Sequence, residues 1–311
     1  MLRFTMRRLL QMIPTIIAVA LLIFVIFSVV PGSFASSLMA DGKTASDPEL
    51  LARLNEQFGL DKPVYIRAWE YLSGLAHFDL GTSFRTREPV LDVINDRIWA
   101  SLKLSIAAMV FAIVIGVPLG FIAALRPGSV LDSITMIGAV SGLSMPQFWL
   151  GLLLMYFFAL VLGWLPSFGY GGGDLKYLIL PAITLGVTPL ALLARTTRAG
   201  VLEITNEDFI RTAHSKGMSN SRVIRWHLMR NVMVLVVTTI GLQFGSMMGQ
   251  AVVIEKLFSW PGIGSLLIDS VSIRDIPVVQ GTILVIVLWF LLINTFVDII
   301  YAAIDPRIKQ T

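Results

Sequence analysis

The chain has 311 residues, of which 56% are hydrophobic and 14% charged, and its formal net charge is +4. Soluble domains carry about 25% charged residues, so this composition is that of a membrane protein and not of an ordinary soluble one. The sequence contains no cysteine, which excludes disulfides, thiolate metal sites and a thiol nucleophile.

Membrane-spanning helices are the first elements expected. A spanning helix needs roughly 20 mostly apolar residues at a rise of about 1.5 Å each. The third candidate is interrupted by Pro146, which membrane helices tolerate when neighbouring groups satisfy the freed backbone. We therefore expect an all-α membrane protein with about six transmembrane helices. The expected spans cover residues 9–30, 98–125, 134–162, 177–194, 232–254 and 278–303.

The first apolar segment allows two interpretations. Arg3, Arg7 and Arg8 precede an apolar run followed by SFASS, a pattern that also fits a signal peptide with cleavage after Ala35. The apolar region of a signal peptide is about 7–15 residues long, whereas the whole of residues 9–30 is free of charge. We therefore favour an uncleaved first helix.

Lysine and arginine in the short loops set the expected orientation. If the N-terminus is cytoplasmic, that side also holds the basic loop at 195–230, while the opposite short loops hold only Lys176, Lys256 and Arg274. Because cytoplasmic loops carry the excess of positive charge, both termini are expected inside. The chain then divides into an N-terminal helix at 1–30, a periplasmic segment at 31–97 and a five-helix core at 98–306, which includes a cytoplasmic loop at 199–231 and a periplasmic loop at 255–277.

The basic cytoplasmic loop is expected to contain a short helix at residues 206–216. Thr205 provides an N-cap, and Asp208, three residues on, completes a pattern resembling a capping box. Glu207 and Arg211 stand one turn apart in the order that favours an ion pair. This helix is therefore an element separate from the spans on either side.

The end and one face of this short helix indicate a contact surface. Lys216 lies in its last turn, and Gly217 is expected to end it. Ala213 and Gly217 share a face and remove bulk where another backbone could come close. The pattern predicts a docking surface, but a helix lying in lipid headgroups with its arginines on anionic lipid would show the same pattern. Spacing alone favours neither interpretation.

Sequence stretches along nearly the whole chain resemble one transporter family. EDFIRTAHSKG in the basic loop is similar to the cytoplasmic loop of ABC-transporter importer permeases, with Gly217 at the glycine of that pattern. The leading acid and first alanine of the pattern are missing, as is common in the dipeptide, oligopeptide and nickel branch. Further stretches resemble the first-type permease subunit of that branch. They are FGLDKP, FDLGTSF, SMPQFWLG, LGWLPSFG, YLILPA, EKLFSWPGIGSLL, RDIPVVQG and the terminal DPR. One difference is PGSF, which stands where that subunit often has PGDP.

This resemblance implies a type I ABC importer permease in the bacterial inner membrane. Two permeases, this subunit and a second related one, would enclose a pathway that a periplasmic substrate-binding protein loads. Two cytoplasmic ATP-binding subunits would act on the short helix. The implied cargo is di- or oligopeptides, with nickel chelates, glutathione and oligosaccharides as further cargoes of the family. The implied ATPase-coupling residues are Glu207, Asp208, Arg211, Ala213, Lys216 and Gly217.

The loop at 255–277 is a second candidate site. It combines turn-forming residues with charges on the outer side, between two spans. The resemblance implies a periplasmic gate, a re-entrant loop that meets the binding protein, and a simple amphipathic connection is the alternative. The candidate gate residues are Glu255, Pro261, Gly262, Gly264, Arg274 and Asp275.

Asp298 is the clearest charge within a span. An acid inside the membrane indicates a functional site by default. The family resemblance also places an acid near the terminal DPR, which implies that Asp298, Asp305 and Arg307 anchor the end of the last helix.

Catalytic and metal-binding motifs are missing from the sequence. The tripeptide GKT at 42–44 lacks the glycine that a phosphate-binding loop requires at position 37, so ATP is expected to be hydrolysed by partner subunits. His77, His214 and His227 show no metal-site spacing, and no GxSxG motif occurs. We therefore expect no enzyme activity, cofactor, metal or nucleic-acid partner. The alternative function is an ion-coupled secondary transporter of small solutes.

Overall fold

The computed structural model describes residues 2–29, 56 and 61–304, and the described part is helical apart from turns and an isolated bridge between Thr82 and Pro89. Five described helices are long and apolar enough to cross a membrane, or six if one bent pair counts as a span. The prediction of an all-α membrane protein with about six spans is confirmed. The elements are α1 (Leu2–Val29), α4 (Val64–Ala76), α5 (Val90–Leu125), α6 (Val130–Ser144), α7 (Gln147–Leu154), η1 (Met155–Val161), η2 (Gly171–Gly173), α8 (Leu175–Thr205), α9 (Asp208–Ser215), α10 (Asn220–Val223), η3 (Ile224–Leu228), α11 (Met229–Leu257), α12 (Ile263–Ser272) and α13 (Ile276–Ile304).

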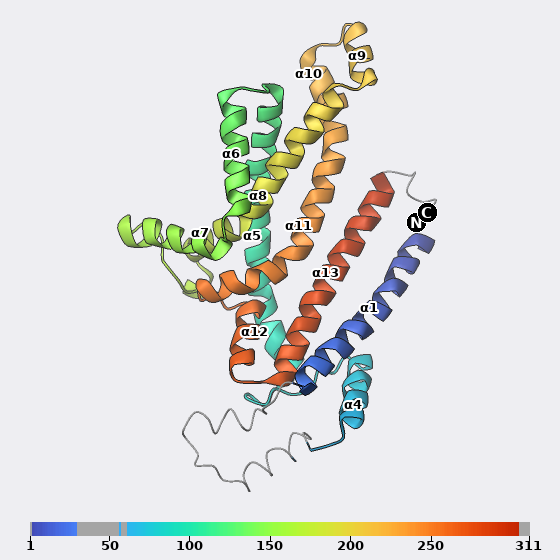
Figure 1. Cartoon of the computed structure of the whole chain (residues 1–311), viewed down its shortest axis with the longest axis vertical. Coiled ribbons are helices and arrows are strands. Elements are labelled where there is room, and N and C mark those ends of the chain that lie inside the picture. The colour runs from blue at the N-terminus through green and yellow to red at the C-terminus, as the bar shows by residue number, and fades with distance from the viewer. Residues whose placement is uncertain (1, 30–55, 57–60, 305–311) are drawn as a thin grey trace.

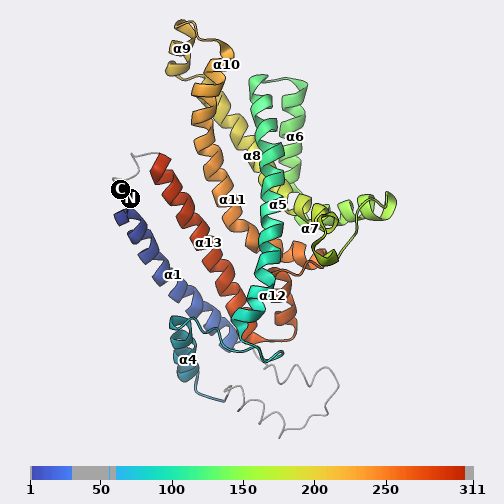
Figure 2. The same ribbon diagram turned by 180° about the vertical axis from the view of Figure 1, so that it is seen from behind.

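The two ends of the bundle carry different elements (Figure 1). The α9–α10 elbow extends beyond α8 and α11 at one end, and α12 and α4 lie at the other. Seen from behind, α1 and α13 run beside each other along one side of the bundle (Figure 2). The α1 helix begins, and α13 ends, toward the end that carries the elbow. The two candidate functional segments therefore occupy opposite ends of the molecule.

The main core lies where α5, α8 and α11 meet, and it includes the fully buried Leu104, Leu185 and Met247. Small residues bring α5 and α8 into close approach. A side chain at Gly120 would meet the backbone of Ala194. Apolar side chains gain little by leaving lipid, so close backbone packing of this kind is a main source of helix association in membranes.

The expected third span is sharply broken. The chain bends by 108° between α6 and the helix that runs through α7 and η1. Met145 is extended at φ −85° and ψ 129°, because a residue before proline is forced out of the helical region. The interruption predicted at Pro146 is present, but the bend is far sharper than a tolerated kink, and α7 projects sideways from the bundle (Figure 1).

Several sequence predictions fall outside the described residues. These are the possible cleavage after Ala35, the GKT tripeptide at 42–44 and two of the three anchor residues, Asp305 and Arg307.

Candidate coupling and gate sites

The elbow formed by α9 and α10 is the candidate coupling site, and its first helix begins later than predicted. The hydroxyl of Thr205 donates to the Val201 carbonyl at 2.6 Å, so this residue ends α8 and does not cap α9. Threonine side chains compete for the carbonyl one turn earlier in this way. Glu207 occupies the N-cap position without a side-chain cap bond. Arg211 lies 3.7 Å from Asp208, and not beside Glu207 as expected.

The apolar face of α9 packs inside the elbow itself. Ile210 and Ala213 are buried against Val223, and Met218 closes the cluster. Ala213 therefore packs α9 against α10 and does not lie open to a partner, in contrast to the expectation that it clears room for one. The side chains that α9 exposes include Asp208, Arg211 and Phe209, which is 42% exposed.

Gly217 ends the elbow's first helix as predicted. Its φ is +76°, a left-handed conformation that glycine adopts without strain. The Met218 amide donates to the Ala213 carbonyl at 3.2 Å, and the Gly217 amide donates to His214 at 2.9 Å. A Cβ built on Gly217 meets no atom within 4 Å. Within this chain, bulk at position 217 therefore causes no clash.

At the opposite end of the bundle, Glu255 is fully buried and joins three elements. Its carboxylate accepts a hydrogen bond from the Ser101 hydroxyl of α5 at 2.5 Å. It also accepts from the Gly264 amide at 2.8 Å and the Ser265 amide at 3.1 Å, both in α12. The Ser101 oxygen in turn accepts from the Ile263 amide at 2.8 Å. Glu255 thus fastens the start of the candidate gate loop to α5 and α12.

Asp275 holds the other end of the same loop by hydrogen bonds, and the Asp275 residue is only 2% exposed. Its carboxylate accepts from the Ser83 hydroxyl at 2.6 Å and from the Phe84 amide at 3.0 Å. These donors belong to the segment between α4 and α5, distant in sequence from the gate. Arg274, beside it, is exposed and has a positive φ of 58°.

Trp260 packs at the centre of the candidate gate loop. It is fully buried, and its indole nitrogen donates to the Ala100 carbonyl at 2.9 Å. The Tyr170 ring meets it edge to face, with 4.8 Å between ring centroids. The Gly169 amide donates to the Phe258 carbonyl at 2.8 Å. The segment before α8 and the gate loop therefore close against α5 as one packed unit.

The gate glycines are required for space and not for backbone angles. Gly262 has an ordinary φ of −96°, and Gly264 does not appear among the positive-φ residues. A Cβ on Gly262 would meet the Glu255 carboxylate, and one on Gly264 would meet the Val252 backbone. Gly262 and Gly264 are thus needed because the backbone packs closely around a buried acid.

Comparison with known proteins identifies the kind of molecule that carries these two sites. Residues 116–310 match the family described as the binding-protein-dependent transport system inner membrane component. Residues 1–107 match the N-terminal part of such membrane components. The chain belongs to this family. It is the permease subunit of an ABC transporter, a multi-pass protein of the inner membrane, and not itself an enzyme.

Two curated relatives extend over nearly the whole chain. The glutathione transport system permease protein GsiC of Escherichia coli O6:H1 is 43% identical over 309 residues, covering 99% of each protein. The dipeptide transport system permease protein DppB of Alkalihalophilus pseudofirmus is 40% identical over 335 aligned positions, covering 99% of this chain and 100% of the relative. The sequence resemblance to this branch of importer permeases is confirmed.

Solved structures support the permease fold. An inward-facing MetNI methionine ABC transporter chain matches with a TM-score of 0.57 at 20% identity, covering 70% of this chain and 99% of that one. A chain of an amino acid ABC transporter solved with histidines matches at a TM-score of 0.53 and 16% identity, covering 68% and 94%. A binding-protein-dependent ABC component implies ATPase and binding-protein partners, which favours ATP-driven import over an ion-coupled carrier.

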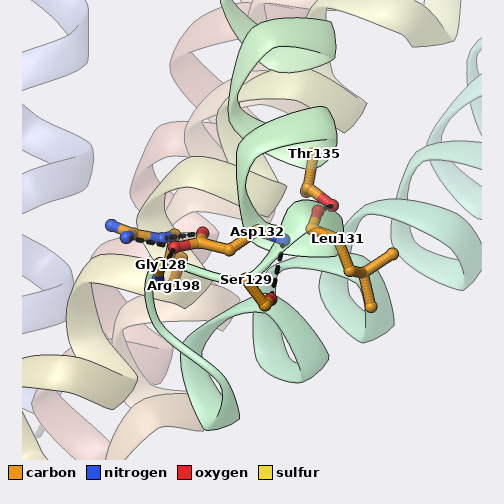
Figure 3. Close-up of polar contacts among 6 residues, drawn as sticks. All are labelled: Gly128, Ser129, Leu131, Asp132, Thr135 and Arg198. Atoms are coloured by element: carbon orange, nitrogen blue, oxygen red, sulfur yellow. Dashed lines mark hydrogen bonds and ion pairs between the residues drawn. The ribbon is translucent and has the colours of Figure 1, made fainter.

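Sequence reasoning missed the ion pair between Arg198 and Asp132 in this permease. Arg198 of α8 donates to both carboxylate oxygens of Asp132 in α6, at 2.5 and 2.8 Å (Figure 3). Asp132 also accepts from the Gly128 amide at 2.9 Å, and Ser129 caps α6 by accepting from the Asp132 amide at 3.2 Å. The Ser-x-x-Asp pattern at 129–132 resembles a capping box and indicates where α6 begins, but no local pattern shows that Arg198, far along the chain, lies beside it.

Asp298 lies on α13 and pairs with α1. Its carboxylate is 3.1 Å from the Arg8 guanidinium. The neighbouring Thr295 hydroxyl lies 3.4 Å from the Met12 sulfur, also on α1.

Among the described residues, no group of three or more acidic or histidine side chains could hold a metal ion.

Proposed function

We propose that this permease imports short peptides, including glutathione, together with a second related permease, two cytoplasmic ATP-binding subunits and a periplasmic binding protein. The observation that carries the proposal is the full-length similarity to two permeases, 43% identical to a glutathione system and 40% identical to a dipeptide system. Glutathione is itself a short peptide, so both relatives are named for cargo of one chemical class. The binding protein selects among members of that class.

The α9–α10 elbow is the proposed ATPase-coupling site. It extends beyond α8 and α11, where a partner can reach it, and its own apolar cluster makes it a compact unit (Figure 1). Isolated exposed ion pairs contribute roughly 0–1 kcal/mol each, so shape is expected to matter more than any one charge. The coupling residues are Glu207, Asp208, Arg211, Lys216 and Gly217 at the surface, with Ala213 holding the elbow together.

The loop at 255–277 is the proposed periplasmic gate. The proposal is supported by hydrogen bonds at both ends of the loop. Buried Glu255 bonds one end to α5, and buried Asp275 bonds the other end to the segment before α5. An amphipathic connection between two spans would not need two buried acids. Exposed Arg274 is the candidate contact for the binding protein, while Glu255, Asp275, Pro261, Gly262 and Gly264 shape the closed loop.

The proposed orientation has both termini and the elbow in the cytoplasm. The start of α1 and the elbow lie toward the same end of the bundle, as this topology requires (Figures 1 and 2). The pair between Arg8 and Asp298 then lies near the cytoplasmic ends of α1 and α13. We propose that Asp298 anchors the last helix there by this contact, with Asp305 and Arg307 in the same role.

Uptake into reconstituted vesicles tests the proposed function. The complete complex, with loaded binding protein outside and ATP inside, is expected to accumulate trialanine and glutathione. Uptake should require ATP and persist when a proton uncoupler is added. A complex that moves neither peptide, or whose uptake stops with the uncoupler while ATP is present, would contradict the proposal.

A further inference from the structure

Three helices of this permease meet through amide and hydroxyl side chains in a region that is otherwise apolar. The Gln147 amide nitrogen at the start of α7 donates to the Thr188 hydroxyl of α8 at 3.0 Å. The same Gln147 nitrogen lies 3.5 Å from the side-chain amide oxygen of Gln250 in α11. The Gln250 amide nitrogen donates to the Ser246 hydroxyl at 2.9 Å. These residues, called the amide cluster below, are all half-buried.

The cluster continues along one face of α11. Gln243, Ser246 and Gln250 follow one another at helical spacing and form a polar stripe of half-buried side chains. Thr239, one turn earlier, is buried and its hydroxyl donates to the Leu235 carbonyl, so it does not extend the stripe. At about 1.5 Å per residue the stripe is roughly 10 Å long, close to the length of an extended tripeptide, which is at most about 11 Å. The stripe is therefore long enough for a short peptide to meet more than one of its side chains in succession.

The amide cluster has hydrogen-bonding capacity to spare. A glutamine amide offers two donors and a carbonyl acceptor. Among the residues that the structure describes, none donates a hydrogen bond to the side-chain amide oxygen of Gln147, and the Gln243 side chain has no hydrogen-bond partner. Polar groups that lack partners are costly in lipid, so this face of α11 must meet water, cargo or another polypeptide.

The position of Gln147 decides between lipid and a pathway. It directly follows Pro146, at the 108° bend between α6 and α7. Irregular backbone at membrane depth is tolerated only where it is buried in protein or lines a water-filled cavity. In secondary transporters, which share the need for a water-filled pathway, interrupted helices line the substrate site. The break and the polar stripe thus point to the same water-accessible face.

We infer that the amide cluster is where this chain hydrogen-bonds the backbone amides of a peptide as the peptide crosses the membrane. The inference rests on the proposed function, since it names the contacts for that cargo. Amide side chains match the alternating donors and acceptors of a peptide backbone, which every short peptide shares. Such contacts accept many side-chain sequences, and selection remains with the binding protein.

Single cysteines test this inference directly, because the chain has none of its own. Gln250→Cys and, as a second position, Gln243→Cys are assembled with the partner subunits in vesicles. A charged, water-soluble thiol reagent is added during ATP-driven turnover, with and without trialanine, and modification of this chain is read by mass spectrometry. Val114→Cys on α5 is the control, because Val114 is 65% exposed among apolar neighbours.

The cluster cysteines are expected to react at least about tenfold faster than Val114→Cys, because a thiolate forms in water and not in lipid. Trialanine is expected to slow their reaction and leave the control unchanged. Failure of both cluster cysteines to react in an assembled complex would overturn the inference. Reaction without protection, in a complex that does import trialanine, would overturn the peptide contact alone. If the unmodified complex imports no peptide, the proposed function fails and the peptide contact with it.

Discussion

At the scale of single residues, Gly262 shows how the buried acid limits its surroundings. Its φ of −96° suits alanine, so Gly262→Ala adds only the clash of a methyl group with the Glu255 carboxylate. Overpacking of this kind typically costs about 1–3 kcal/mol. We expect a lower unfolding temperature of the assembled complex and weaker stimulation of ATP hydrolysis by the binding protein. Pro261→Ala, one residue away and half-buried, is the control. Equal thermal stability of the two variants would contradict the packing assigned to Gly262.

Gly217 gives the second prediction at this scale. Its Cβ position is open within the chain, so any clash of a new side chain must come from a partner. Asparagine tolerates the left-handed conformation and adds bulk, whereas alanine adds little bulk but strains the backbone by about 1–2 kcal/mol. Gly217→Asn is therefore expected to lose more ATPase than Gly217→Ala when the subunits are co-purified in detergent. A greater loss with alanine would show that this glycine serves helix termination instead of clearance.

At the scale of elements, the pair between Asp132 and Arg198 ties α6 to the half of α8 that leads into the elbow (Figure 3). Arg198→Lys keeps the charge but removes the two-pronged geometry of the guanidinium. We expect transport per ATP hydrolysed to fall by roughly threefold or more, because α6 would no longer follow α8 as a rigid neighbour. Arg195→Lys, on the exposed face of α8, is the matched control.

The outcome is measured as the ratio of trialanine uptake to phosphate release in vesicles. An unchanged ratio in Arg198→Lys would mean that the two-pronged geometry of this contact is not what makes α6 follow α8.

The sequence predicted elements better than the contacts between them. Five of the apolar segments are found as long helices, because hydrophobic length alone defines a span. Pro146 was noticed, but the size of the bend depends on how α7 packs, which periodicity cannot show. The sequence predicts a cap at Thr205, because a cap and a threonine that bonds back to the preceding turn look alike in sequence. Burial of Glu255 and Asp275 depends on donors far away in the chain, Ser101 and Ser83, and no local pattern reveals them.

At the scale of the whole molecule, the placement of candidate sites at opposite ends predicts a topology. A reporter that works only in the periplasm is expected to be active when fused at Gly172, before α8, and inactive when fused at Ser215 in the elbow. The physical reason is the excess of lysine and arginine in the loop at 195–230, because loops with such an excess are generally retained in the cytoplasm. The reverse pattern of activities would contradict both the orientation and the ATPase docking proposed for the elbow.

The way Glu255 is held has a consequence for the cell that contains this importer. The Glu255 carboxyl group accepts hydrogen bonds from a hydroxyl of α5 and from two backbone amides of α12. Moving the loop away from α5 and α12 would therefore break all three hydrogen bonds together. Leaving a buried carboxyl group without hydrogen-bond partners is costly. If this loop is the gate proposed above, it is expected to be either shut or fully released. A gate of this kind would let a membrane that holds many idle copies keep its ion gradients, because losing three hydrogen bonds together makes thermal opening rare.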